Sequence, residues 1–332
     1  MNVKNNSFEE IWNRIKTSRD VLISLHYGPD GDSLGCCTAM KYVLKRDFKC
    51  NVKLVGKDNL DEILRAVRFS KEVVLGEGIE DQELEKFDLM LAMDSGSLKQ
   101  FAGREKDFVA PKNLLIINID HHETNEHFGG MNYVDAKRPS ACSVLLDLFR
   151  DRGVNFDKEL ATRLLLGIYT DSGYFSHDNG GSIRDAAFLL DFGVDYLNEI
   201  VNPIKYNYPL RIKKYYAFLY DRFKIIEVNG LRVGHSSISL EEIKKLGLNL
   251  SEVRGGINDL QEVGGLDIVF TLSEMEEIIK GSFRSRKLDI SGIAKVLGGG
   301  GHKGAAAFRL KKMPLEEAER VVLDKISSTF RS

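Results

Sequence analysis

The sequence predicts an α/β protein in which a parallel sheet with flanking helices is followed by a second, smaller α/β domain. Two observations carry this prediction. Over residues 1–130, short apolar runs alternate with amphipathic helical stretches, as a parallel sheet buried on both faces requires. The length of 332 residues also favours two domains, at roughly 150 residues per domain.

The first predicted element is a helix over residues 7–19, where apolar residues recur at helical spacing. Ser7 and Glu10 form a capping-box signature at its start. Five apolar runs typical of buried strands follow, and a helix-rich stretch then extends over residues 140–192. The predicted strands cover residues 21–25, 52–55, 73–75, 87–93 and 114–119.

A change of pattern near residue 200 predicts a domain boundary. Residues 198–210 contain two prolines and little periodicity, so we expect a linker at 198–215 between domains at 1–197 and 216–332. Asn229-Gly230, between two strand-like runs, is a strong hairpin signal. Further strands are predicted over 266–272 and 277–284, and helices around 211–220, 290–297 and 314–328.

The charge balance limits the size of any nucleic-acid partner. Lys and Arg number 47 against 49 for Asp and Glu, which gives a net charge of -2. Proteins that bind long nucleic acid usually have a basic surplus, because neutralisation of phosphates dominates that binding. We therefore expect no long nucleic-acid partner, whereas a local basic cleft could still bind a short one.

The apolar pattern and the cysteines predict where the protein resides. No apolar run reaches roughly 18 residues, and the N-terminus lacks the apolar core of a signal peptide. The four cysteines include no CxxC pair, which favours buried, reduced thiols over disulfides or a thiolate metal site. We therefore predict a cytoplasmic protein with no membrane partner.

Residues able to bind cations follow three of the predicted strands. Taken singly, an Asp at such a position is more often a helix cap or a turn former. Together they should gather, because ligands in open parallel sheets collect at the carboxyl ends of the strands. These residues are His26, Asp30, Asp32, Asp94, Asp120, His121 and His122, and Asp171 follows a further apolar segment at 164–169.

The composition of this group favours divalent cations. Converging carboxylates would repel one another and raise each other's pKa, and bound dications would remove that repulsion. Oxygen and imidazole ligands without thiolates suit Mn²⁺ or Mg²⁺ better than structural zinc. The number of ligands favours two ions.

A second candidate site lies in the predicted second domain. Glycines occupy positions 298–301 ahead of His302 and Lys303, and Arg284 and Arg286 stand at alternate positions of a predicted strand. Glycines let backbone N–H groups approach an anion, and a guanidinium can pair with a phosphate through two hydrogen bonds. We expect this region to bind the phosphate or base of a short nucleotide, although four glycines could also form a plain loop.

In this order, the motifs resemble those of the DHH phosphoesterase superfamily. The segment HxxPDxD over 26–32, the strand-end Asp94, Asp120-His121-His122 and Asp171-Ser172-Gly173 are similar to its catalytic domain. The segments SFRSR at 282–286 and GGGGHKGAA at 298–306 resemble the associated DHHA1 domain. The resemblance covers nearly the whole chain. It implies a DHH domain and a DHHA1 domain with the active site in the cleft between them.

The resemblance also implies a role for each residue. One Mn²⁺ would be held by His26 and Asp30 and a second by Asp32, His121 and Asp171, with Asp94 bridging both; Mg²⁺ is a substitute. Asp120 would orient His121 through its ring N–H, and His122 would face the substrate phosphate, which makes these two the catalytic residues. The substrate-binding residues would be Arg284, Ser285, Gly299, Gly300, Gly301 and His302.

Within the superfamily the chain looks similar to the stand-alone nanoRNase/pAp-phosphatase group. This implies a Mn²⁺-dependent phosphodiesterase that cleaves short 5′-phosphorylated oligonucleotides to mononucleotides. Linear dinucleotides such as pApA, from the degradation of cyclic di-AMP to AMP, are the foremost substrates, and pAp is a related monoester. A single-strand exonuclease of the same superfamily and a non-catalytic nucleotide sensor are the alternatives. A homodimer is compatible with this interpretation.

Overall fold

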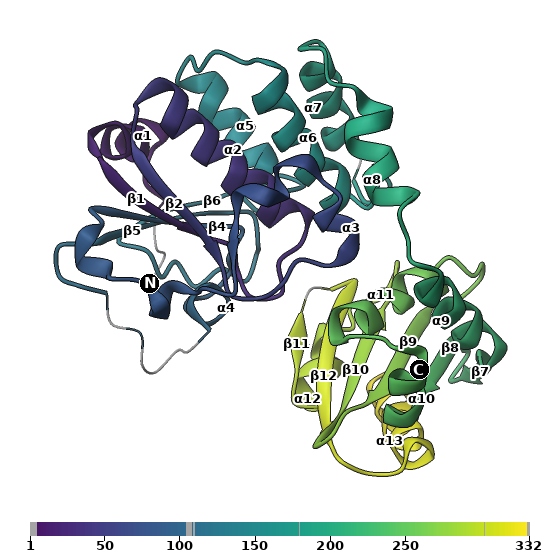
Figure 1. The fold of residues 1–332 in the computed structure, drawn as a ribbon. Coiled ribbons are helices and arrows are strands. Elements are labelled where there is room, and N and C mark those ends of the chain that lie inside the picture. The colour runs from purple at the N-terminus through teal and green to yellow at the C-terminus, as the bar shows by residue number, and fades with distance from the viewer. Residues whose placement is uncertain (1–4, 104–107, 109, 179, 302, 331–332) are drawn as a thin grey trace. The chain divides into compact units, whose positions relative to one another are not determined.

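The structure, a computed structural model, describes residues 5–103, 108, 110–178, 180–301 and 303–330, and of residues 250, 251 and 254 the backbone alone. The chain divides into two units, Met1–Asn207 and Tyr208–Ser332 (Figure 1). Residues 198–215, the predicted linker, contain most of the π-helix η4 (Tyr196–Val201), the helix α8 (Asn202–Lys205) and the start of α9 (Leu210–Asp221).

The first unit contains a six-stranded sheet in the order β3-β2-β1-β4-β5-β6, and all its strand pairs are parallel. The five predicted strands are confirmed. The sixth, β6, was not predicted, because it is a short edge strand without a continuous apolar run. The strands are β1 (Asp20–Ser24), β2 (Asn51–Gly56), β3 (Val74–Leu75), β4 (Leu89–Met93), β5 (Leu115–Asp120) and β6 (Met131–Val134).

Successive residues of each strand enter two different cores. Leu22 and Met90 pack with Phe101 on one face, which the short helix α4 (Leu98–Ala102) helps to cover. Ile23 and Leu91 pack on the opposite face, where four longer helices lie (Figure 1). Those helices are α1 (Phe8–Thr17), α2 (Gly31–Asp47), α5 (Ala141–Asp151) and α6 (Lys158–Asp171), and the predicted capping box of α1 is confirmed.

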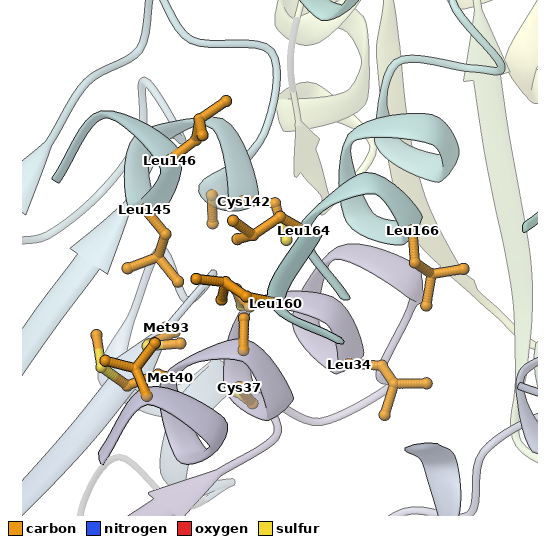
Figure 2. Packing of buried hydrophobic residues seen from close by; sticks show 14 of the residues in the cluster. Leu34, Cys37, Met40, Met93, Cys142, Leu145, Leu146, Leu160, Leu164 and Leu166 are labelled. Atoms are coloured by element: carbon orange, nitrogen blue, oxygen red, sulfur yellow. The ribbon is translucent and has the colours of Figure 1, made fainter. Parts of the chain in front are cut away.

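Helices α2 and α6 approach each other at glycines. A Cβ on Gly35 would lie 2.7 Å from the carbonyl oxygen of Arg163, and a Cβ on Gly167 would lie 2.5 Å from Oδ1 of Asp32. Leucines of α5 and α6 fill the space around this crossing together with Met40 of α2 (Figure 2). The close approach matters for function, because it brings the start of α2 beside the end of α6.

The first unit contains one further helix as long as α1 and several shorter helical segments. Among the predicted helical stretch at 140–192, α7 (Gly181–Leu190) follows α5 and α6, so that prediction is confirmed. The short elements before it are α3 (Glu62–Arg65), η1 (Arg68–Glu72), η2 (Ile79–Asp81) and η3 (Leu84–Lys86).

The second unit contains a mixed sheet in the order β11-β12-β10-β9-β8-β7, in which β8 and β9 are parallel and the other pairs antiparallel. The predicted hairpin at Asn229-Gly230 is confirmed, and both residues have positive φ. The strands are β7 (Lys224–Val228), β8 (Leu231–Ile238), β9 (Ile268–Glu274), β10 (Ile278–Arg284), β11 (Gly300–Gly301) and β12 (Ala305–Lys311). The last two were not predicted.

Two groups of helices pack on the two faces of this second sheet. Helices α12 (Ser291–Val296) and α13 (Leu315–Thr329) enclose a core around Phe283 and Phe308. On the opposite face, α9, α10 (Leu240–Leu246) and α11 (Leu250–Leu260) enclose a core with Tyr215 and Val269. Ala307 and Arg309 of β12 are exposed.

None of the helices within the described ranges has the length and apolar character needed to cross a bilayer. All four cysteines, each within the described residues, are buried and free of disulfides, as predicted.

Candidate metal centre

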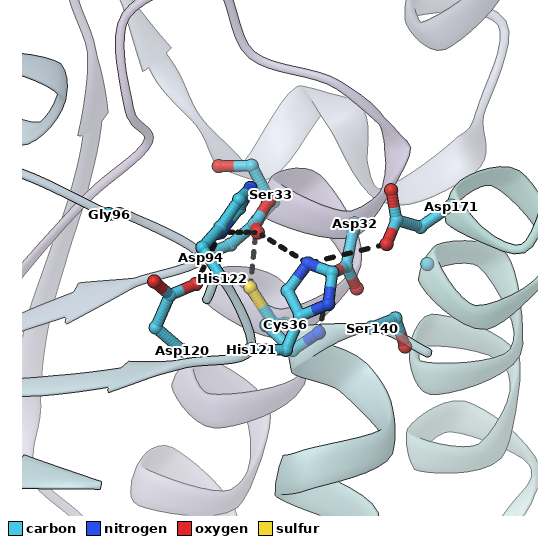
Figure 3. Close-up of polar contacts among 12 residues, drawn as sticks. Asp32, Ser33, Cys36, Asp94, Gly96, Asp120, His121, His122, Ser140 and Asp171 are labelled. Carbon is cyan, nitrogen blue, oxygen red and sulfur yellow. Dashed lines mark hydrogen bonds and ion pairs between the residues drawn. The ribbon is translucent and has the colours of Figure 1, made fainter. Parts of the chain in front are cut away.

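The six predicted metal ligands converge at the carboxyl end of the first unit's sheet. They form two groups of three, and in each group one ligand atom per residue lies within 4.8 Å of the others. The first group is His26, Asp30 and Asp94, and the second is Asp32, His121 and Asp171. In Figure 3, His121 is joined to Asp94 on one side and to Asp171 on the other.

Asp94 connects the two groups. Its Oδ2 lies 3.4 Å from Nε2 of His26, and its Oδ1 lies 3.6 Å from Nε2 of His121. Each carboxylate oxygen therefore faces a different group. Asp94 follows β4 directly and has φ 55, a left-handed conformation that Asp tolerates better than most residues.

Asp30 and Asp32 come from the start of α2, and each also bonds to a helix end. Oδ1 of Asp30 accepts hydrogen bonds from the backbone N–H groups of Asp32 and Ser33, both at 3.0 Å. The carboxylate of Asp32 accepts N–H bonds from Ala141 at 2.6 Å and Cys142 at 3.0 Å, at the start of α5. Helix capping and ligand placement are thus not alternatives here, because the same residues can do both.

Asp171 is the last residue of α6, so the fourth candidate carboxylate comes from a helix end and not from a strand end. Its Oδ2 lies 3.3 Å from Nε2 of His121. The other ring nitrogen of His121 lies 3.4 Å from the carbonyl oxygen of Arg138. That contact and the one to Asp171 set the direction of the His121 ring.

Arg138 is itself held by two carboxylates. Its guanidinium lies 2.8 Å from Asp185 and 3.0 Å from Asp147. Asp185 is buried and also accepts a hydrogen bond from the hydroxyl of Ser143 at 2.6 Å. This network was not predicted from the sequence, because Arg138 contacts His121 through its backbone carbonyl oxygen and belongs to none of the recognised motifs.

The structure corrects the predicted role of Asp120. Its Oδ1 pairs with Nδ1 of His122 at 2.7 Å, and its Oδ2 accepts a hydrogen bond from Asn125 at 2.5 Å. Asp120 therefore orients His122, and the prediction that it orients His121 is wrong. In an extended chain, residues two apart point to the same side and adjacent residues point to opposite sides.

Two asparagines that sequence reasoning missed support Asp120. The Nδ2 group of Asn125 also donates to Oδ1 of Asn118 at 2.8 Å. Asn118 is buried in β5 and donates to the carbonyl oxygens of Ala92 and Ser95. The only signal was Asn118 itself, a polar residue within an otherwise apolar run.

In a third group, one ligand atom per residue again lies within 4.8 Å of the others; its members are Asp94, Asp120, His121 and His122. We do not assign it a separate ion, because Asp94 and His121 already belong to the two groups above and Asp120 is paired with His122. The pair of Asp120 and His122 instead borders the two groups that share Asp94.

The ionisable side chains of the centre shift one another's pKa values. Burial and the charge of Asp94 raise the pKa of Asp32 to about 7, and burial raises the pKa of Asp171 well above its usual range. Burial acts to lower the pKa of His26 and His121, but hydrogen bonds to Asp94 and the charges of the surrounding carboxylates together outweigh it and raise these pKa values to about 10 and about 11. Bound dications would replace these protons.

The donor set fits hard divalent cations. The two groups offer carboxylate oxygens and imidazole nitrogens, which suit Mn²⁺ or Mg²⁺. Two thiols lie near Asp32. The Sγ of Cys142 contacts the carbonyl oxygen of Asp32, and Cys36 lies one turn after Asp32 in α2. Burial raises the pKa of both thiols well above the usual range, which disfavours the thiolate form that binds metal.

The predicted substrate residues of the second unit have mixed surroundings. Arg284 ends β10, and its guanidinium donates to Oδ1 of Asn258 at 3.0 Å and to the carbonyl oxygen of Phe283 at 2.9 Å. The hydroxyl of Ser285 donates to the carbonyl oxygen of Asp267 at 2.7 Å. Arg286 lies beyond the end of the strand and is exposed, so the predicted alternation with Arg284 within one strand is wrong.

The glycine run is explained largely by packing. A Cβ on Gly299 would lie 2.0 Å from the carbonyl oxygen of Ala307, and one on Gly301 would lie 2.6 Å from that of Ala305. Both glycines thus allow the chain to lie against β12. A Cβ on Gly300 would meet nothing within 4 Å, so this position adjoins open space. His302 lies outside the described residues.

The chain matches two family models and several full-length relatives. The model of the DHH family, N-terminal domain, matches residues 20–168, and the model of the DHHA1 domain matches residues 235–332. The bifunctional oligoribonuclease and PAP phosphatase NrnA of Thermus thermophilus is 28% identical, over 95% of this chain and 94% of the relative. The protein of the same name from Bacillus subtilis is 23% identical, over 92% and 93%.

Solved structures share the fold. An exopolyphosphatase-related protein from Bacteroides fragilis superposes with a TM-score of 0.86 at 21% identity, over 98% of this chain and 97% of that one. RecJ from Thermus thermophilus in complex with Mn²⁺ superposes with a TM-score of 0.57 at 14% identity, over 97% of this chain and 54% of that one. These likenesses support the two-domain α/β fold predicted from the sequence.

Proposed function

The chain belongs to the DHH/DHHA1 family of phosphoesterases, and we propose that it hydrolyses short 5′-phosphorylated oligonucleotides to mononucleotides with the help of divalent cations. One observation carries the proposal. Two groups of three ligands meet at Asp94, whose two oxygens face different groups. The full-length relatives named oligoribonuclease and PAP phosphatase support the choice of substrate.

We propose Mn²⁺ as the cation, with two ions per centre and Mg²⁺ as a substitute. His26 and Asp30 would hold one ion and Asp32, His121 and Asp171 the other, with Asp94 shared. Bound dications would supply Lewis acidity, which lowers the pKa of water and offsets negative charge on phosphate oxygens. The Mn²⁺ in the related RecJ structure supports this choice of metal.

His122 and Asp120 are the proposed catalytic pair. Asp120 accepts a hydrogen bond from Nδ1 of His122 at 2.7 Å, which fixes the ring and balances a positive charge on it. We propose that His122 contacts a substrate phosphate oxygen, where such a charge would be stabilising. Asn118 and Asn125 hold Asp120 in place and so maintain this arrangement.

The second unit would bind the substrate outside the reacting phosphate. Arg284 and Gly300 are the strongest candidates, since Arg284 is a half-buried cation and Gly300 adjoins open space. Ser285 would act through the backbone it holds, because its hydroxyl already bonds to Asp267 and Leu288. Gly299, Gly301 and His302 complete the proposed set. A cytoplasmic location and a homodimer remain predictions from the sequence.

A substrate comparison tests the proposal. The purified chain would be treated with a chelator and then titrated with Mn²⁺ in the presence of pApA, pAp or a five-nucleotide RNA. We expect hydrolysis to require Mn²⁺, pApA to be cleaved fastest to AMP, and pAp to lose a phosphate more slowly. Cleavage of none of the three at any Mn²⁺ concentration would contradict the enzymatic proposal and favour a nucleotide sensor.

A further inference from the structure

A hollow of about 700 Å³ lies over β10 and β12 of the second unit. Its walls include Lys280, Ser282 and Arg284, which alternate along β10, together with Arg309 of β12 and the glycine run at 298–301. Among its described lining residues, three are cations and none is an acid. This imbalance favours an anionic ligand.

The register of the two strands places two of these cations opposite each other. Lys280 pairs directly with Arg309 in the antiparallel ladder of β10 and β12. Both side chains are cations on the same face of the sheet. A phosphate between or above them could therefore pair with both.

The third cation lies at the other end of the same strand. Arg284 is four residues from Lys280, which corresponds to about 13 Å along a strand. Its guanidinium bonds to neutral oxygens of Asn258 and Phe283, and among the described residues no carboxylate forms an ion pair with it. The hollow therefore has two separated positively charged ends, with the hydroxyl of Ser282 between them.

We propose that Lys280 and Arg309 form a second phosphate subsite, beyond the one proposed at Arg284. This inference rests on the proposed function and concerns how tightly its longer substrates bind. A dinucleotide such as pApA has only one phosphate besides the one that is cleaved. A trinucleotide has a further phosphate, so the second subsite would strengthen the binding of substrates of three or more nucleotides, while pApA remains the substrate with the fastest expected turnover.

Direct binding tests this subsite without relying on catalysis. The full chain, kept in a chelator to prevent cleavage, would be titrated with pApA and with pApApA. We expect the wild type to bind pApApA about tenfold more tightly, as one additional charged contact allows. K280A and R309A should each reduce this advantage to less than about twofold and leave pApA binding nearly unchanged.

Lys311 offers a matched control, because it is an exposed cation on the same strand as Arg309 but outside the hollow. K311A should preserve the length preference. The slope of log affinity against log salt for pApApA should fall by about 0.7 in R309A and stay unchanged in K311A, as loss of one phosphate contact to a single strand predicts. Circular dichroism would establish that each variant is folded.

The outcomes separate this inference from the proposed function. Equal weakening of pApA and pApApA in K280A and R309A, or no weakening of either ligand, would overturn the second subsite. Absence of phosphoesterase activity would instead refute the proposed function, while the binding preference would still report on the subsite.

Discussion

The candidate sites of the two units are built from side chains of opposite charge. In the first unit, four carboxylates and two imidazoles converge at one sheet edge, and the group is suited to dications. In the second unit, three cations line a hollow without an acidic lining residue among those described. A net charge of -2 therefore conceals a group rich in carboxylates in one unit and a group of cations in the other. Global charge limits the size of a partner, whereas local charge determines its chemistry.

Histidines in the two units illustrate the same contrast. Burial acts to lower the pKa of His26, but Asp94 and Asp30 outweigh it and raise the pKa to about 10. His235 is buried in the second unit and stacks on Phe270 at 4.9 Å, and burial lowers its pKa. The same side chain is thus driven toward the charged form in one unit and toward the neutral form in the other.

The largest expected effect comes from Asp94→Asn, which would remove the negative charge shared by the two ligand groups of the first unit. Hydrolysis of pApA should fall more than about 100-fold, beyond the range typical of residues that only position a ligand. Calorimetric titration should show fewer Mn²⁺ ions bound per chain. Asp191→Asn, at an exposed position, serves as the control. Full activity with an unchanged ion count in D94N would show that Asp94 is not shared.

A smaller loss of Mn²⁺ affinity is expected for Asp185→Asn. This substitution tests whether metal binding in the first unit also depends on residues behind the ligands. Asp185 holds Arg138, whose carbonyl oxygen faces His121. Mn²⁺ affinity should fall about tenfold, at the lower end of the effect of groups behind metal ligands. Excess Mn²⁺ should restore kcat, because the ligands themselves remain. A loss of kcat that excess Mn²⁺ does not restore would contradict a positioning role.

Arg284→Ala tests the second unit by itself. The loss of a charged hydrogen-bonding partner should weaken hydrolysis of pApA about tenfold, measured as kcat/KM. Hydrolysis of the unphosphorylated dinucleotide ApA should change less than about twofold, and Mn²⁺ affinity should not change. Arg286→Ala, beyond the strand end, is the matched control. Equal losses on pApA and ApA would exclude a phosphate-specific role.

The smallest effect is a pH dependence of stability in the second unit. Because burial lowers the pKa of His235 below its unfolded value of about 6.5, the folded state binds fewer protons than the unfolded state. Stability should therefore fall as pH decreases through about 6.5, by at most about 1.4 kcal/mol per pH unit. Glu319 opposes the shift and Lys224 adds to it.

Hydrogen exchange in β8 and β9, corrected for intrinsic rates, would measure this dependence between pH 7.5 and pH 5. His235→Phe keeps an aromatic ring against Phe270 and removes the titrating group. The variant should therefore lose most of the pH dependence. An equal pH dependence in H235F would assign the effect to other groups.

The sequence predicted those features that follow from contiguous patterns. The five apolar strands of the first sheet and the convergence of residues at their ends follow from periodicity and from the geometry of parallel sheets. Strands β6, β11 and β12 were missed, because β6 and β11 are short and β12 begins with three alanines, which are depleted in strands. Asn125 and Asp185 were also missed, since their roles depend on contacts between segments far apart in the chain.

Side-chain direction explains the two corrections. Asp120 was predicted to serve His121, and only the extended backbone after β5 shows that it faces His122. Arg284 and Arg286 were predicted to share a strand face, but β10 ends at Arg284. Residue types and spacing therefore identified which groups gather, and the backbone path decided which of them pair.

The left-handed backbone at Asp94 restricts which residues evolution can place there. For most residues this conformation costs roughly 1–2 kcal/mol, and Asp, Asn and Gly tolerate it best. Glu would preserve the negative charge, but its backbone would be strained and its longer side chain would displace the carboxylate. Asn would preserve the backbone and remove the charge. The backbone and the charge thus impose two independent requirements at this position, and Asn or Gly there would retain the fold while removing the carboxylate that both ligand groups share.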